Sequence, residues 1–127
     1  ECLVKNVPED VETHQLAIGA EEKMISLSED DFTQSKRVIG EGTIPMITID
    51  SLGIDDIDLI KIDVEGFEME VLKGAEKTLG KVRYIMIELN NATKKYGSSN
   101  IEIENYIGSL GFKVLINHWP DKVFYRA

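Results

Sequence analysis

The sequence predicts an α/β domain, and two apolar strands separated by a helix carry this prediction. The run from Asp58 to Val64 reads DLIKIDV, which is typical of a strand that helices cover on both faces. Apolar residues at helical spacing follow this strand, and residues 82–89, VRYIMIEL, form a second apolar strand. This alternation predicts a parallel sheet with right-handed crossovers. The length of 127 residues fits a single domain, 1–127.

Three further strands and a polar loop are expected in the first half of the chain. The strands lie at 11–18, closed by a glycine, at 23–27 and at 44–49, and the loop spans 28–42. Asp50 follows the third strand and is expected to cap a single helical turn.

The helix after the first buried strand is expected at 66–79. Its apolar residues recur at helical spacing and predict one core-facing side. Gly74 costs about 1 kcal/mol relative to alanine inside a helix, so we expect a kink or break there. The predicted core-facing residues are Phe67, Val71, Leu72, Ala75 and Leu79.

The C-terminal part predicts one more helix and an antiparallel hairpin. Ser99 and Glu102 have the spacing of a capping box, which marks the start of the helix. Its expected core face consists of Ile103, Tyr106, Ile107 and Leu110. Strands at 112–116 and 122–125 flank a His-Trp-Pro-Asp turn and form the hairpin.

Carboxylates gather where the two buried strands end. Asp63 and Glu65 follow the first strand, and Glu88 with Asn90 ends the second. Ligands of open parallel sheets bind at these carboxyl ends, where a carboxylate could orient or deprotonate a hydroxyl. Spacing alone favours a simpler interpretation, in which Asp63 caps the helix and Glu65 interacts with its dipole. A divalent-cation site at the same pair is a third alternative.

Lys61 lies in the middle of the first buried strand, where a lysine needs a partner. It either neutralises Asp63 or Glu88 and contacts a substrate, or forms a structural ion pair. Both alternatives are open from the sequence.

Composition excludes several classes of function. The formal charge of -9 disfavours nucleic acid as a partner, and no apolar run is long enough to span a membrane. Cys2 is a single cysteine and the N-terminus has no signal-peptide pattern, so we expect a cytoplasmic protein. His14 and His118 are too isolated for metal-ligand spacing, and no metal is expected.

The segment 57–68, IDLIKIDVEGFE, followed by VLKGA at 71–75, resembles the FkbM family of S-adenosylmethionine-dependent methyltransferases. Upstream, TIDSL at 48–52 is similar to a short element of that family, and YIMIE at 84–88 is similar to its next strand. The segments around Asn6-Val7 and LAIG at 16–19 resemble the region of its third strand. The resemblance covers most of the chain in the correct order.

The resemblance implies a Rossmann-like class I methyltransferase sheet and S-adenosylmethionine as methyl donor. The implied reaction is O-methylation of a small-molecule or sugar hydroxyl. It implies a catalytic role for Asp63 and Glu65, substrate binding by Lys61, Glu88 and Asn90, and cofactor binding by Ala17, Ile18 and Gly19.

The chain departs from the family pattern on the cofactor side. The glycine-rich loop after the first strand and the acidic residue ending the second are not in these 127 residues, and Gly40-Glu41-Gly42 lacks the context of a nucleotide loop. The sheet is therefore expected to be incomplete on its N-terminal side, with an uncovered parallel edge that favours self-association. The sequence begins at Glu1, and we expect either a longer parent chain or a degenerate domain that acts as a non-catalytic binding or assembly module.

Overall fold

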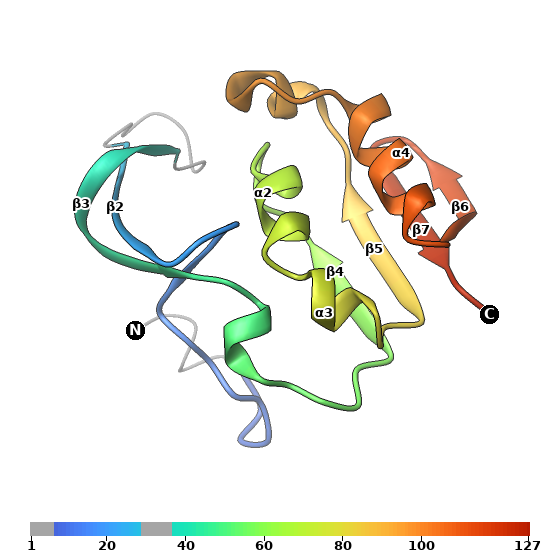
Figure 1. Cartoon of the computed structure of the whole chain (residues 1–127), viewed down its shortest axis with the longest axis horizontal. Coiled ribbons are helices and arrows are strands. Elements are labelled where there is room, and N and C mark those ends of the chain that lie inside the picture. The colour runs from blue at the N-terminus through green and yellow to red at the C-terminus, as the bar shows by residue number, and fades with distance from the viewer. Residues whose placement is uncertain (1–6, 29–36) are drawn as a thin grey trace.

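The computed structural model describes residues 7–28 and 37–127, which form two sheets with three helices packed on the second (Figure 1). The first sheet contains β1 (Ala17–Ile18), β2 (Lys23–Leu27) and β3 (Val38–Ile47) in the order β1-β3-β2. β1 runs parallel to β3, and β2 runs antiparallel to it. The α/β class predicted from the sequence is confirmed, with mixed parallel and antiparallel pairing.

Two boundaries in this first sheet were predicted wrongly. Only Ala17–Ile18 of the strand expected at 11–18 is paired. The loop expected at 28–42 is wrong from Val38 onward, because β3 begins there; residues 29–36 lie outside the described residues. Ser26 pairs with Gly40 and Leu27 with Val38, so cross-strand partners hold this polar, glycine-containing segment in the ladder.

A short helix, η1 (Asp50–Leu52), leads from the first sheet toward the second. Asp50 does not cap this turn, contrary to the expectation, because the N-cap residue is Ile49. Its carboxylate instead accepts the backbone N–H groups of Lys77 (3.0 Å) and Thr78 (2.8 Å), at the start of α3 (Glu76–Leu79). Asp50 therefore caps a helix 26 to 28 residues further along the chain, through a tertiary contact that local spacing does not reveal.

The second sheet contains β4 (Leu59–Ile62), β5 (Tyr84–Glu88), β7 (Asp121–Tyr125) and β6 (Lys113–His118), in the order β4-β5-β7-β6. β4 and β5 are parallel, whereas β7 is antiparallel to both β5 and β6. α2 (Glu68–Lys73) and α3 connect the parallel pair. β4 is an edge strand of this sheet in the described part of the chain.

The helix expected at 66–79 is broken at Gly74 into α2 and α3, as the sequence indicated. Two contacts explain the break. The Gly74 carbonyl accepts the Asp50 N–H at 3.0 Å, and a side chain at Gly74 would collide with the carbonyl oxygen of Gly19. The break is thus the place where the first sheet approaches the helices.

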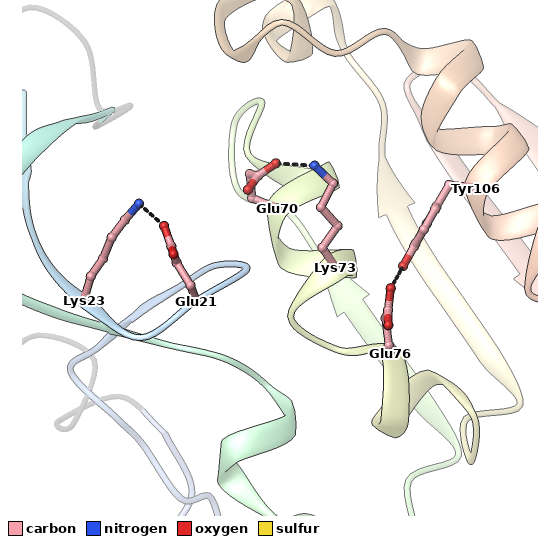
Figure 2. Close-up of polar contacts among 6 residues, drawn as sticks. All are labelled: Glu21, Lys23, Glu70, Lys73, Glu76 and Tyr106. Atoms are coloured by element: carbon pink, nitrogen blue, oxygen red, sulfur yellow. Dashed lines mark hydrogen bonds and ion pairs between the residues drawn. The ribbon is translucent and has the colours of Figure 1, made fainter.

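η2 (Asn91–Tyr96) and α4 (Asn100–Ser109) follow β5. The predicted capping box of α4 is confirmed, with Ser99 and Glu102 bonded reciprocally. The Tyr106 hydroxyl of α4 donates to Glu76 of α3 at 2.9 Å, which places the two helices side by side (Figure 2). Burial, and secondly this bond, raise the pKa of Tyr106 to about 12.

The three α-helices lie on one face of the four-stranded sheet (Figure 1). The expectation that helices cover both faces of the Asp58–Val64 strand is wrong for the described residues. Leu59 points away from the helices and is 52% exposed, whereas Ile62, on the helix side, is buried. Alternation within β4 therefore distinguishes an open face from a covered one.

One apolar core lies between the four-stranded sheet and its helices. It contains the predicted α2–α3 residues, with Phe67 at its margin, and both buried residues of the predicted α4 face. Its buried members are Ile62, Val71, Leu72, Ala75, Leu79, Val82, Ile85, Ile87, Leu89, Ile103, Ile107, Phe112 and Phe124.

Candidate functional site

The carboxyl end of β4 carries an exposed ion pair between Lys61 and Asp63. Lys61 Nζ lies 2.8 Å from Asp63 Oδ2, and the two side chains are 52% and 38% exposed. Lys61 therefore is not the buried lysine that its apolar neighbours suggested, because it points to the open face of the sheet. Asp63, through its hydrogen bond and its charge, raises the pKa of Lys61, and the charges of Asp121 and Glu88 act in the same direction.

A second polar group joins the ends of β4 and β5 through Asn90. Asn90 Nδ2 lies 3.2 Å from Glu88 Oε1 and 3.5 Å from Glu65 Oε2. The side chains of Glu65, Glu88 and Asn90 thus meet at the carboxyl ends of the two parallel strands. We call Lys61, Asp63, Glu65, Glu88 and Asn90 the strand-end cluster.

The orientation of Asn90 follows from its place before η2. Its Oδ1 accepts the backbone N–H of Ala92 at 2.8 Å, which caps η2. With its oxygen engaged there, Asn90 directs its amide N–H groups toward the two carboxylates. A capping contact therefore fixes a donor at the site.

The turn that presents Glu65 has an uncommon backbone conformation. Glu65 has φ 54° and Gly66 has φ 111°, and a side chain at Gly66 would lie 2.5 Å from the carbonyl oxygen of Ala92. A non-glycine residue in this region costs about 1–3 kcal/mol and often marks a functional site. The simpler interpretation, with Asp63 as helix cap, is wrong: the N-cap of α2 is Phe67, which has no side-chain cap bond, and Asp63 pairs with Lys61.

Glu68 is a polar residue that the sequence interpretation did not assign to the site. It begins α2, is only 1% exposed, and accepts the Gly66 N–H through Oε1 at 2.9 Å. Its place three residues after Glu65 and two after Gly66 was the available signal. Helical periodicity does not predict that this glutamate is buried.

The residues that the resemblance assigns to the cofactor lie on the other sheet. The Gly19 N–H donates to the Ile47 carbonyl at 2.9 Å, and a side chain at Gly19 would lie 2.5 Å from Met46 Sδ and 3.2 Å from Phe67. Gly19 therefore packs against the residue that follows the Glu65–Gly66 turn. Ile18 packs at the margin of the main core, and Ala17 lines an open depression of about 540 Å³ together with residues of β3.

The depression beside Ala17 and a second one are both separate from the strand-end cluster. A second depression, of about 500 Å³, is lined by Asp55, Asp56, Ile57, Asp58, Lys81 and Arg83, near the amino end of β4. Neither depression is lined by a residue of the cluster. The cluster is instead a polar surface at the strand ends, open to solvent.

The described residues contain neither a metal-binding group of side chains nor a membrane-spanning helix. No three His, Cys, Asp or Glu side chains in residues 7–28 and 37–127 are grouped to hold a metal ion. Within the same ranges, every helix is too short or too polar to cross a lipid bilayer.

Comparisons with known proteins agree with the α/β fold. The sequence model of the Methyltransferase FkbM domain matches residues 3–114. The crystal structure of methyltransferase FkbM from Methylobacillus flagellatus KT is similar in fold, with a TM-score of 0.57 and 23% identity over 88% of this chain. The match covers 27% of that protein's chain. Comparison with curated proteins gave no match. Since the family model spans most of the sequence, the chain belongs to the FkbM methyltransferase domain family.

Proposed function

We propose that this chain forms the acceptor side of an S-adenosylmethionine-dependent O-methyltransferase with a Rossmann-like class I sheet. The observation that supports this most is the strand-end cluster. In a member of a methyltransferase family, the Lys61–Asp63 ion pair and the Asn90 amide bound to Glu65 and Glu88 both lie at the carboxyl ends of two parallel strands. Open α/β sheets bind their ligands at this edge.

The proposed acceptor is a small-molecule or glycan hydroxyl. Glu65 accepts or orients the hydroxyl proton, because its carboxylate lies at the surface on a fixed turn. Asn90 lines the acceptor side, and its N–H donor to Glu65 orients that carboxylate toward the acceptor. Asp63 is the second candidate base, and Lys61 beside it balances part of the negative charge. Glu88 holds the Asn90 amide.

The described residues provide only part of a cofactor site. Ala17 and Ile18 offer an apolar strand end suited to a purine, but the Gly19 N–H is already bonded to Ile47. S-adenosylmethionine also needs hydrogen-bond partners for its ribose and for its amino-acid carboxylate. The described contacts of β1 do not provide these partners. When bound, the cofactor supplies an electrophilic methyl group. The residues of this chain would place and deprotonate the acceptor.

A non-catalytic binding or assembly module is the second candidate. One observation favours it: β4 is an edge strand with Leu59 half exposed, and the sheet face that carries Leu59 is open in the described residues. Unpaired edges favour self-association. Sedimentation of the full-length protein separates the two proposals, since this alternative requires an assembly that binds no S-adenosylmethionine.

The test of the main proposal is calorimetry of the full-length protein with S-adenosylmethionine. We expect saturable binding, followed by release of S-adenosylhomocysteine when a panel of sugars and other hydroxyl compounds is added. Absence of binding at millimolar cofactor would overturn the proposal.

A further inference from the structure

Glu68 is a buried carboxyl group that the proposed chemistry does not use directly. Only 1% of the residue is exposed, and burying a carboxylate is costly unless it is paired or hydrogen-bonded. Burial raises the pKa of Glu68, and the nearby charge of Glu65 raises this pKa further. Backbone N–H groups of the same turn act in the opposite direction, because they favour the charged form. Its Oε2 has no hydrogen-bond partner among the described residues.

The bonded oxygen of Glu68 points back over the turn before α2. Oε1 accepts the Gly66 N–H at 2.9 Å, so the side chain closes a ring over Gly66 and Phe67. Gly66 is itself buried and pressed against the Ala92 carbonyl. The turn is therefore held between Glu68 on one side and the start of η2 on the other.

This fixation matters because the turn is strained at Glu65. Its φ of 54° is costly for a residue with a side chain, and such a conformation persists only where surrounding contacts hold it. The same conformation carries the Glu65 carboxylate to within 3.5 Å of Asn90 Nδ2. Releasing Gly66 would let the turn relax and would move that carboxylate.

We propose that Glu68 is a positioning residue, whose buried carboxyl group holds the Glu65–Gly66 turn and keeps the Glu65 carboxylate beside Asn90. The geometric part of this inference stands alone, and its catalytic meaning rests on the proposed function. Glu68 itself does not touch the acceptor.

Two variants of similar size separate positioning from packing. Glu68→Gln keeps an oxygen that can accept the Gly66 N–H, whereas Glu68→Met fills the space without an acceptor. Glu70→Gln is the matched control, because Glu70 lies on the same helix and pairs with Lys73 at 2.9 Å, away from the turn (Figure 2).

The readouts are two NMR measurements on the full-length protein labelled with ¹⁵N at glycine and asparagine. In Glu68→Met the Gly66 amide should exchange with solvent about 10-fold faster, since one hydrogen bond to a charged group is lost. In wild type, the chemical shift of the Asn90 side-chain amide should change with pH as the Glu65 carboxyl group titrates, and Glu65→Gln should remove this step. Glu68→Met should remove the same step. Glu68→Gln and Glu70→Gln should keep both signals.

An Asn90 titration in Glu68→Met that still contains the Glu65 step would overturn the inference, as would equal losses in Glu68→Gln and Glu68→Met. If Glu68→Met does not fold, wild-type protein labelled with both ¹³C and ¹⁵N decides: a scalar coupling between the Gly66 nitrogen and the Glu68 carboxyl carbon supports the inference, and its absence overturns it. Neither measurement uses cofactor or acceptor, so failure here is distinct from failure of the methyltransferase proposal.

Discussion

The two sheets of this domain bury their side chains to very different extents. The four-stranded sheet and its helices enclose thirteen buried apolar residues in one core. The three-stranded sheet contributes Ile25 and Met46 as its fully buried apolar residues among those described, and Ile39 of β3 is 63% exposed. The strand-end cluster stands on the well-packed sheet, whereas the residues assigned to the cofactor stand on the thinner one.

This difference indicates which functional geometry is fixed within the domain. A close-packed core holds side chains at its edges in defined positions, because few alternative arrangements fill the same space. The strand-end cluster has that support. The first sheet depends on a few contacts to the second, at Gly19, Gly74 and Tyr96, whose hydroxyl accepts the Val38 N–H at 3.1 Å.

The largest effect is expected from a pair of core truncations. Ile85 and Ile25 are both fully buried, but only Ile85 belongs to the main core. Ile85→Ala should lower the free energy of unfolding by about 3–5 kcal/mol, and Ile25→Ala by about 2 kcal/mol or less, because its neighbourhood can collapse around the cavity. Urea denaturation measures both. A larger loss in Ile25→Ala would contradict the comparison.

The contact between the two sheets is tested by two glycine substitutions. Gly74→Ala would bring a methyl group onto the Gly19 carbonyl and close to Thr48, and should destabilise by about 1–3 kcal/mol. Gly108→Ala, in α4, meets no neighbouring atom within 4 Å and should stabilise by up to about 1 kcal/mol. Thermal unfolding measures whether each substitution raises or lowers stability. If Gly74→Ala also stabilises the protein, the sheets do not meet at Gly74.

The cap that links η1 to α3 predicts a pH-dependent effect. Burial opposes ionisation of Asp50, but hydrogen bonds from Lys77 and Thr78 lower its pKa below the ordinary value. Asp50→Ala should cost about 1–2 kcal/mol near neutral pH. A depressed pKa stabilises the folded state above the ordinary aspartate value, so this cost should shrink as the pH falls through the folded pKa.

Denaturant titrations from neutral to acidic pH measure the Asp50 effect. Asp55→Asn is the control, because Asp55 forms only an exposed pair with Lys81. A cost for Asp50→Ala that does not change with pH would contradict the assigned role.

The smallest effect on stability concerns Glu68, and its dependence on pH is opposite in direction to that of Asp50. Its raised pKa means that the folded state binds a proton more tightly than the unfolded state does. Stability relative to Glu68→Gln should therefore fall as the pH rises from the ordinary glutamate value through the raised one. Denaturation at a series of pH values measures this slope, and a slope of the opposite sign would show that burial does not govern this carboxyl group.

Sequence patterns predicted the second sheet well and the first poorly, for a physical reason. β4, β5 and their helices are specified by local periodicity and by a shared core, which sequence spacing reveals. β3 extends through Gly40 and Gly42 because β2 pairs with it, and a tertiary partner of this kind leaves no periodic signal. The same limit explains the misplaced cap at Asp50.

The candidate site was predictable in its members but not in its contacts. Strand ends followed by Asp63, Glu65, Glu88 and Asn90 predict proximity, since parallel strands bring their carboxyl ends together. The sequence did not reveal that Asn90 bridges two carboxylates or that Glu68 holds the turn, because both depend on side-chain orientation.

The most direct test of the account compares cofactor binding with methyl transfer in the full-length Glu65→Gln protein. The account predicts unchanged affinity for S-adenosylmethionine and a methyl-transfer rate lower by at least about 100-fold, because a positioned base is lost. Glu70→Gln should match wild type in both measurements. Wild-type transfer rates in Glu65→Gln would contradict the claim that the strand-end cluster is the acceptor side of a methyltransferase.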